Sequence, residues 1–402
     1  MAGSTEVRIT LAGDARKLSR RRFLQAAAAG AAGLAGLPPA LTQEPGKLPR
    51  RKLPGTDLEL TPIGYGSEYI DDLALVDHIL KQGVNYIDTA WLYLAGNSER
   101  KVAEVLKGNP GVHVFTKPNK FPSGTAKEIF LTCFNESYER LGVKTVDIML
   151  IHDARTPERV ENTGCWEAFK ELRDAGKAKW FGLSIHYGTT ECVLKATELG
   201  WFNVIMVAWN FMSPPALTEA VKKAADKGIG IIAIKTCQPL AATCPTWWTR
   251  ATEQDRQKLE GPNLFQAAIK WTLSHDFITS TVLAMGNYDQ ANEDLAAARE
   301  AKPTKEEANA LRRFAQRTSA SYCRGCGACE RTCPQRIAIA DTLRYGVYHQ
   351  GYRQPQAARA KYASLPEGRT FAACTACGSC TKACPHGLPV REQLQRAHGL
   401  LA

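Results

Sequence analysis

The chain has 402 residues, of which 44% are hydrophobic and 23% charged, and its formal net charge is +11. This composition is ordinary for a folded globular protein and argues against extensive disorder, and the length allows one large domain and a smaller one. The positive charge lies mostly at the two ends, since residues 301–402 hold sixteen Lys and Arg against six Asp and Glu. The middle is slightly acidic and has no aromatic-basic platform, so we expect no nucleic-acid partner.

The N-terminal region has the pattern of a bacterial export signal. A basic stretch at 16–25 is followed by twelve uncharged, mostly apolar residues at 26–37, which are too few to span a bilayer as a helix. The letters Ser19-Arg20-Arg21-Arg22-Phe23-Leu24 resemble the twin-arginine (Tat) signal, although a frayed amphipathic terminus is the alternative. The sequence therefore predicts a Tat signal peptide and spacer over residues 1–43. It also predicts recognition by the Tat translocase and export to the periplasm or another extracytoplasmic location.

The next region, up to about residue 299, alternates short β-rich runs with helical patterns, which is typical of βα repetition and a parallel sheet. Eight strands are expected, near 62–64, 85–87, 112–115, 146–151, 180–183, 204–207, 229–233 and 279–283. Eight units in about 240 residues predict an α/β fold of the (β/α)8 TIM-barrel type over residues 50–300. No Gly-x-Gly-x-x-Gly follows a strand, which disfavours a doubly wound sheet.

Four polar residues follow successive strands of this expected barrel, at the end where TIM barrels carry their chemistry. Asp88 ends the second strand, Tyr93 comes five residues later, and Lys117 and His152 follow the third and fourth. Each alone could be structural, but the four together indicate carbonyl chemistry, in which negative charge on oxygen must be met by a proton and fixed donors. We expect Tyr93 to be the general acid/base, with a pKa lowered by Lys117 and Asp88. A small carbonyl or alcohol is the expected substrate.

The motifs around these residues resemble the aldo-keto reductase superfamily over roughly residues 53–295. The resemblance rests on Asp88-Thr89-Ala90-x-x-Tyr93, Asn97-Ser98-Glu99, Phe115-Thr116-Lys117 and Leu150-Ile151-His152. In that family the aspartate, tyrosine, lysine and histidine form a catalytic tetrad. The resemblance therefore implies that role for Asp88, Tyr93, Lys117 and His152.

The same resemblance implies a site for NAD(P)(H), from which this sequence departs. Ile185 and Met206 stand where the family holds the nicotinamide carboxamide with Asn and Gln, and neither side chain offers a normal hydrogen bond. Gln290 stands where members commonly put an arginine on the 2'-phosphate. The positions that the resemblance assigns to nucleotide contacts are Ser184, Asn210, Gly286, Asn287, Gln290 and Glu293. NADPH, NADH and no nucleotide remain open.

The C-terminal region carries eight of the thirteen cysteines, in two copies of Cys-x2-Cys-x2-Cys-x3-Cys-Pro at 323–334 and 374–385. This pattern is typical of two [4Fe-4S] clusters, in which the fourth cysteine of each motif serves the other cluster. The expected ligand sets are Cys323, Cys326, Cys329 with Cys384, and Cys374, Cys377, Cys380 with Cys333. Zinc is the alternative metal for these cysteines, but the third cysteine and the proline in each copy favour an iron-sulfur cluster. Residues 301–320 have the pattern of a charged helical linker. The stretch between the two motifs is long and rich in helix formers, so residues 321–402 resemble an all-helical ferredoxin-like domain.

A barrel with a reductase tetrad and two clusters resembles the ferredoxin-fused branch of the aldo-keto reductases. The sequence therefore predicts an iron-sulfur oxidoreductase that reduces or oxidises a carbonyl or alcohol and passes electrons through two [4Fe-4S] clusters. A redox partner protein or a quinone-linked donor would supply or accept those electrons. Two alternatives remain, namely an NAD(P)H-dependent carbonyl reductase with structural clusters, and an electron-transfer or sensing protein whose barrel binds no nucleotide.

Overall fold

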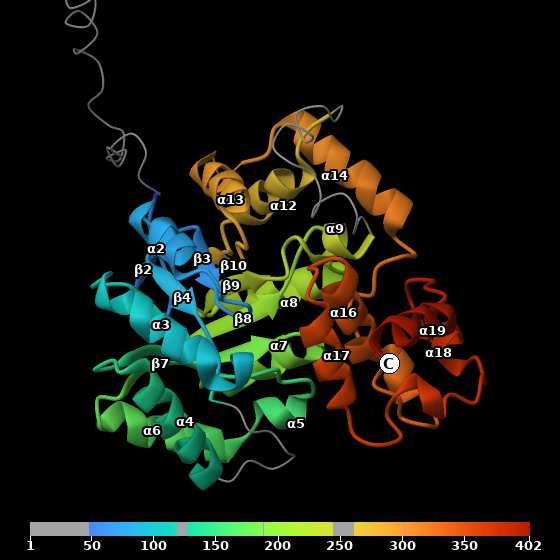
Figure 1. Cartoon of the computed structure of the whole chain (residues 1–402), viewed down its shortest axis with the longest axis horizontal. Coiled ribbons are helices and arrows are strands. Elements are labelled where there is room, and N and C mark those ends of the chain that lie inside the picture. Colours follow the sequence, from blue (N-terminus) through green and yellow to red (C-terminus); the bar gives the residue numbers. More distant parts are fainter. Residues whose placement is uncertain (1–47, 119–126, 188, 244–260, 301) are drawn as a thin grey trace, which may run out of the picture. The chain divides into compact units, whose positions relative to one another are not determined.

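Eight parallel strands close into a barrel with helices around it (Figure 1). The computed structural model describes residues 48–118, 127–187, 189–243, 261–300 and 302–402, and the predicted export signal at 1–43 lies outside them. Each strand pairs with its neighbour in the chain, and β10 closes the ring by pairing with β3. The strands are β3 (Ile63–Gly66), β4 (Tyr86–Asp88), β5 (His113–Thr116), β6 (Val146–Ile151), β7 (Ala178–Ile185), β8 (Val204–Ala208), β9 (Gly230–Ile234) and β10 (Ser280–Leu283). The predicted (β/α)8 fold is confirmed.

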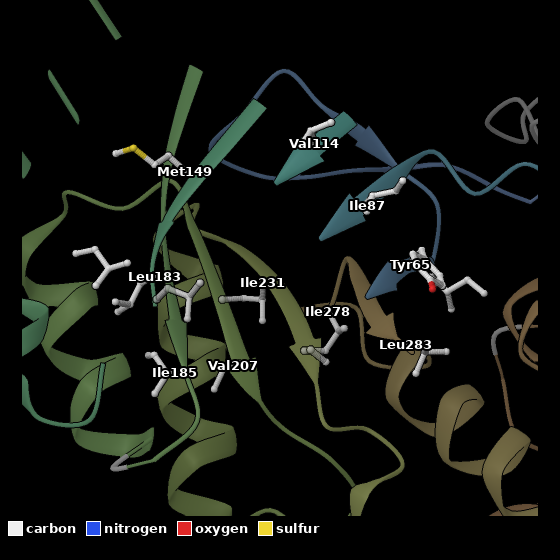
Figure 2. Packing of buried hydrophobic residues seen from close by; sticks show 14 of the residues in the cluster. Tyr65, Ile87, Val114, Met149, Leu183, Ile185, Val207, Ile231, Ile278 and Leu283 are labelled. Atoms are coloured by element: carbon white, nitrogen blue, oxygen red, sulfur yellow. The ribbon is translucent and has the colours of Figure 1, made fainter. Parts of the chain in front are cut away.

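The strands bury apolar side chains on both faces, because one face of each strand lines the barrel interior and the other packs against the surrounding helices. On β6, Ile148 and Leu150 fill the barrel interior, whereas Met149 and Ile151 pack into the cluster shared with the surrounding helices. Successive side chains of a strand point to opposite faces, so near-continuous apolar runs are needed where both faces are covered. Figure 2 shows part of the outer cluster, to which Ile185 of β7 belongs.

A two-stranded hairpin covers one end of the barrel and was not expected from the sequence. It consists of β1 (Arg51–Lys52) and β2 (Glu59–Leu60). Leu53 and Leu60 join the interior cluster, and Asn203, which precedes β8, donates to the carbonyl of Gly55. The hairpin therefore plugs the amino-terminal end of the barrel and leaves the carboxyl-terminal end of the strands for chemistry.

Helices pack around the strands, and one more helix extends this layer. They are α2 (Leu73–Lys81), α3 (Asn97–Lys107), α4 (Lys127–Leu141), α5 (Pro157–Val160), α6 (Thr163–Asp174), α7 (Thr189–Leu199), α8 (Pro215–Asp226), α9 (Gln238–Thr243), α12 (Leu264–Leu273) and α13 (Tyr288–Glu300). Helix α14 (Lys305–Thr318), in the segment expected as a linker, packs against α12, where Lys270 donates to Glu307 at 2.9 Å. Its Leu311 and Phe314 are buried in a cluster with Phe265. No described helix combines the length and the apolar character needed to cross a membrane.

The C-terminal module, residues 321–402, is built of helices and loops without strands, as expected. Its helices are α15 (Ala328–Arg331), α16 (Ile339–Gln350), α17 (Pro355–Ala363), α18 (Ser379–Lys382) and α19 (Val390–Leu401), with a 3-10 turn η2 (Phe371–Ala373). The two cysteine motifs repeat one local structure, because Gly327 and Gly378 both have positive φ, 73° and 76°, immediately before a short helix. This left-handed turn suits glycine, which has no Cβ to clash. The module and the barrel belong to one compact unit, Gly46–Ala402.

Candidate active site and cluster sites

Asp88 and Lys117 form a buried ion pair at the carboxyl-terminal end of the barrel. Asp88 is the last residue of β4, and Lys117 follows β5, the neighbouring parallel strand. The Lys117 ammonium donates to both carboxylate oxygens of Asp88 at 2.6 Å and to the carbonyl of Thr89 at 2.9 Å. Burial raises the pKa of Asp88 and lowers that of Lys117, and their mutual hydrogen bonds oppose both shifts. Because the Lys117 ammonium donates two short hydrogen bonds to the Asp88 carboxylate, the pair is favoured in its charged form over two neutral groups.

Tyr93 and His152 lie beside this pair, so the structure brings together all four residues predicted for catalysis. The Lys117 ammonium lies 5.1 Å from the centre of the Tyr93 ring. The His152 ring, which follows β6, meets the Tyr93 ring edge-on, with centroids 5.8 Å apart. Parallel strands that are neighbours in the chain end at the same rim, which is why residues far apart in the sequence converge here.

The backbone after Tyr93 turns sharply, and a polar network holds that turn in place. Tyr93 begins a 3-10 turn, η1 (Tyr93–Gly96), in which Leu94 and Ala95 have positive φ of 50° and 53°. Such left-handed backbone costs energy for residues other than glycine and persists only where the surroundings enforce it. Glu99 accepts hydrogen bonds from Thr116 at 2.7 Å and Arg140 at 3.0 Å. The Asn-Ser-Glu motif therefore anchors the turn that carries Tyr93.

The titration behaviour of the site favours neutral Tyr93 and neutral His152. Burial raises the pKa of Tyr93 well above its ordinary value, and the carboxylates of Glu68 and Asp88 add to the rise. Burial and the Lys117 charge lower the pKa of His152 to about 3. The expected lowering of the tyrosine pKa is therefore not found, because burial and the two carboxylates outweigh the opposing charge of Arg344. The Tyr93 hydroxyl therefore keeps its proton at neutral pH, and the neutral His152 ring has one N–H donor and one acceptor nitrogen.

The C-terminal module contributes side chains to the same rim. Lys235, which follows β9, donates to the hydroxyl of Tyr348 on α16 at 3.0 Å. Lys361 of α17 lies 3.2 Å from Glu68, which follows β3. Arg344, also on α16, stacks over the ring of Tyr187 at 4.7 Å. Sequence reasoning missed these residues, although Glu68, His186 and Lys235 obey the same rule of polar residues just after strands.

Two enclosed apolar spaces in the module are surrounded by cysteines in the combinations expected from the sequence. One is lined by Cys323, Cys326, Cys329 and Cys384, and the other by Cys333, Cys374, Cys377 and Cys380. Each set takes three cysteines from one motif and the fourth from the other. Four thiolates around a closed apolar space are the donor set of a [4Fe-4S] cluster, so the residues fit this group. Among the described residues, no three His, Cys, Asp or Glu side chains are grouped to hold a single metal ion.

The positions assigned to a nucleotide fall into two separate groups. Ser184, at the end of β7, is buried and its hydroxyl has no partner among the described residues. Asn210 is engaged, since it donates to the Lys235 carbonyl at 3.2 Å and to the hydroxyl of Tyr322 in the module at 3.4 Å.

The second group lies at the start of α13 and largely bonds within its own loop. Gln290 accepts from the Gly286 amide at 2.9 Å, and Asn287 accepts from the Gln290 amide at 2.9 Å. Glu293 accepts from Asn263 at 3.2 Å. The Gln290 side chain thus stabilises its own loop, at the position where members of the family commonly have a phosphate-binding arginine.

A closed (β/α)8 barrel with a lysine, aspartate, tyrosine and histidine at its catalytic rim, joined to a cysteine-rich helical module, defines an oxidoreductase with an iron-sulfur domain. Residues 65–316 match the model of the aldo/keto reductase family, and residues 308–389 match that of the 4Fe-4S dicluster domain. The chain belongs to the aldo/keto reductase family and carries a C-terminal 4Fe-4S domain.

Similar proteins are more distant in sequence than in fold. The chain is 24% identical to L-galactose dehydrogenase of Arabidopsis thaliana over 289 residues, which cover 63% of this chain and 89% of that protein. It is 24% identical to a D-threo-aldose 1-dehydrogenase of a Pseudomonas species over 44% of this chain and 65% of the relative. The holo form of an aldo-keto reductase from Bacillus halodurans superposes with a TM-score of 0.54 and 23% identity, covering 66% of this chain and 96% of that one. These likenesses support the fold and the oxidoreductase class.

Proposed function

We propose that this protein interconverts a small carbonyl compound and its alcohol at the Asp88, Tyr93, Lys117 and His152 site. In this proposal electrons pass through two [4Fe-4S] clusters held by the C-terminal module, and a nicotinamide nucleotide is not the reductant. One observation carries the proposal. A Cβ added at Gly325, between Cys323 and Cys326, would lie 3.0 Å from Tyr187 and 3.1 Å from the carbonyl oxygen of His186. The first cysteine motif therefore packs directly on the residues that follow β7.

This contact connects the first cysteine motif to the tetrad through one histidine. The His186 ring lies 6.1 Å from the His152 ring, and the His152 ring lies 5.8 Å from that of Tyr93, measured between centroids. When bound, two clusters would supply two electrons, one each, which is the number that carbonyl reduction consumes. The rings of His186 and His152 thus lie between the loop that bears Cys323 and the hydroxyl-bearing ring of Tyr93.

The residues of the barrel supply the proton and the orientation. Reduction of C=O to CH–OH takes up two electrons and two protons, of which Tyr93 delivers the one that reaches oxygen and water the other. Neutral His152 directs a ring N–H toward the same oxygen, and the Lys117 ammonium stabilises the negative charge that develops there. Asp88 holds Lys117 in place through both carboxylate oxygens. In the oxidising direction the same groups act in reverse.

The nucleotide-dependent reductase is the second candidate, and one observation favours it. The Ser184 hydroxyl is buried without a partner among the described residues, as a residue awaiting a ligand would be. Against it, Asn210 already contacts Tyr322 of the module, Ile185 packs into the outer hydrophobic cluster, and Met206 lies in the barrel interior. The third candidate, an electron-transfer or sensing protein, does not explain why Asp88, Tyr93, Lys117 and His152 lie together at one end of the barrel.

We also propose export of this protein by the Tat route and exchange of electrons with a redox protein or a quinone-linked donor. The support is the twin-arginine pattern at residues 19–24, and the fact that Tat carries folded cargo suits clusters that are assembled in the cytoplasm. Fusion of the leader, residues 1–43, to a reporter tests this step. A reporter exported only in cells with a working Tat translocase is expected, and export that ignores replacement of Arg20 and Arg21 by lysine contradicts it.

A nucleotide titration separates the two enzyme candidates. Anaerobic holo-protein is titrated with NADPH and with NADH while nucleotide fluorescence and cluster absorbance are followed. We expect that neither NADPH nor NADH binds tightly, and that neither lowers the cluster absorbance. Dithionite, in contrast, should lower it. Saturable nucleotide binding with a Kd in the micromolar range or below would instead establish the second candidate. Metal analysis of the same sample should find iron, and zinc in its place would contradict the cluster assignment.

A further inference from the structure

A cavity of about 400 Å³ lies between the barrel rim and the C-terminal module. On the barrel side it is lined by His186 and Lys235, and on the module side by Cys323 and Arg344, among others. It adjoins the space enclosed by the first cysteine set, with which it shares Cys323, Arg324, Ala340 and Leu343, and it shares no lining residue with the second. A volume of this size is at the lower end of the range for small-molecule sites, so a compact ligand fits it better than a dinucleotide.

Basic side chains predominate in the wall of this cavity. Lys235, Arg324, Arg344 and Arg396 line it, and none of its lining residues in the described part of the chain is Asp or Glu. The nearby carboxylate of Glu68 lies closer to Lys361, at 3.2 Å, than to Lys235, at 4.0 Å. The four cations in the described wall outnumber the two carboxylates that pair with them from outside it, Glu68 with Lys235 and Asp341 with Arg344, so the wall attracts negatively charged ligands.

Two nitrogen atoms in the wall have no partner among the described residues. They are Nε of Arg344 and Nδ1 of His186, both buried from water. Arg344 uses an Nη2 donor on Asp341 at 2.9 Å, and Lys235 uses one N–H on Tyr348 at 3.0 Å, so each cation keeps further donors for a ligand. Buried polar nitrogens without partners are uncommon in proteins, and the remaining N–H groups of Arg344 and Lys235 are the donors that a ligand in the cavity would meet.

We propose that this cavity binds the oxyanion group of the substrate, a carboxylate or a phosphate, with Arg344 as its main anchor and Lys235 as the second. The substrate class is then an anionic hydroxy or oxo compound whose reacting carbon extends past His186, which lines the cavity and whose ring lies 6.1 Å from that of His152; no tetrad residue lines the cavity itself. A guanidinium matches the geometry of carboxylate and phosphate groups with paired donors. This inference rests on the proposed function, since it names the substrate of the same site. It also assigns substrate recognition to a side chain of the C-terminal module.

Matched pairs of probes test the proposal without requiring turnover. Calorimetry on anaerobic holo-protein compares lactate with propane-1,2-diol, and glycerol 3-phosphate with glycerol. Each pair keeps a secondary alcohol and differs in the oxyanion group. We expect the anionic member of at least one pair to bind about tenfold to a hundredfold more tightly. The pair that responds distinguishes carboxylate from phosphate. Equal affinity within both pairs overturns the proposal.

Variants locate the binding. Arg344→Gln and Lys235→Gln should each weaken anion binding about tenfold or more, while Arg313→Gln, an exposed arginine of α14 outside the cavity, should not. Lys235→Gln keeps the test decisive if Arg344→Gln disturbs the module, and cluster absorbance reports whether each variant is intact. An equal loss in all three variants would mean general charge attraction and would overturn the assignment.

The two hypotheses fail in different ways. Anion binding without any cluster-driven turnover would refute the proposed function and leave the site in place. Turnover of neutral carbonyl compounds with no preference for anions would refute the substrate class and leave the function in place.

Discussion

Arg155 of the barrel and Asp341 of the C-terminal module form a bidentate ion pair, with distances of 2.5 Å from Nη1 to Oδ2 and 3.0 Å from Nη2 to Oδ1. Arg155 lies three residues after His152, and Asp341 lies in the first turn of α16. Tyr187 supports the contact by donating to the carbonyl of Ala340 at 3.3 Å. One short segment thus carries a tetrad residue and also holds the helix that bears Arg344.

We expect Arg155→Gln to loosen the module from the barrel. The substitution removes two charge-assisted hydrogen bonds to a buried carboxylate, each worth about 1.5–3 kcal/mol in comparable settings. Turnover should fall while both clusters stay bound, and proteolysis between the barrel and the module should speed up. Arg173→Gln is the control, because it removes an exposed arginine that pairs with the neighbouring Asp174 and lies over the Phe169 ring of its own helix. Unchanged turnover in Arg155→Gln would contradict a coupling role for this ion pair.

The buried Lys117 and Asp88 pair should show strong coupling in a double-mutant cycle. Lys117→Met leaves a carboxylate buried without its cation and should cost about 3–5 kcal/mol in the free energy of unfolding. Adding Asp88→Asn should recover part of that loss, because an uncharged amide is less costly to bury. Urea unfolding of the two single variants and the double variant measures the coupling. Strictly additive losses would contradict the charged pair.

The pH dependence of stability should report neutral, buried His152. Its pKa of about 3 in the folded protein lies below the value of about 6.5 in an unfolded chain, so the unfolded state binds more protons below pH 6.5. Stability is therefore fully present above that pH and falls as the pH decreases, on the order of 1 kcal/mol per pH unit. The unfolding midpoint of the wild type should drop between pH 7 and pH 5 by more than that of His152→Gln. Parallel pH curves would speak against the assignment.

The fold and the tetrad could be predicted because both follow from local patterns and strand order. The apolar runs of β6 and β8 identify strands, and residues directly after neighbouring parallel strands, such as Asp88 and Lys117, must meet at one rim. The β1–β2 hairpin was missed because two-residue strands leave no periodic signal. The roles of Arg344 and Tyr348 depend on how the module docks on the barrel, and that docking is decided by contacts such as Arg155 with Asp341, which no sequence pattern reveals.

The cysteine sets predict which substitutions disturb the same cluster. Cys384→Ser and Cys329→Ser should alter one electron paramagnetic resonance signal, and Cys333→Ser and Cys380→Ser should alter the other. The reason is that Cys384 lines the space of the first motif, and Cys333 that of the second. If Cys333→Ser instead disturbed the same signal as Cys329→Ser, each motif would hold its own cluster and the assignment would be wrong.

The most direct test of the account is carbonyl reduction driven by reduced methyl viologen in the absence of any nicotinamide nucleotide. Anaerobic holo-protein is assayed beside Tyr93→Phe, which lacks the proton donor, and the rate of cluster reduction is recorded in both. We predict turnover by the wild type, a loss of about 10² to 10⁴ fold in Tyr93→Phe, and equal cluster reduction. Turnover that appears only when NADPH or NADH is added, with viologen ineffective, would contradict the proposal that electrons reach the carbonyl through the clusters without a nucleotide.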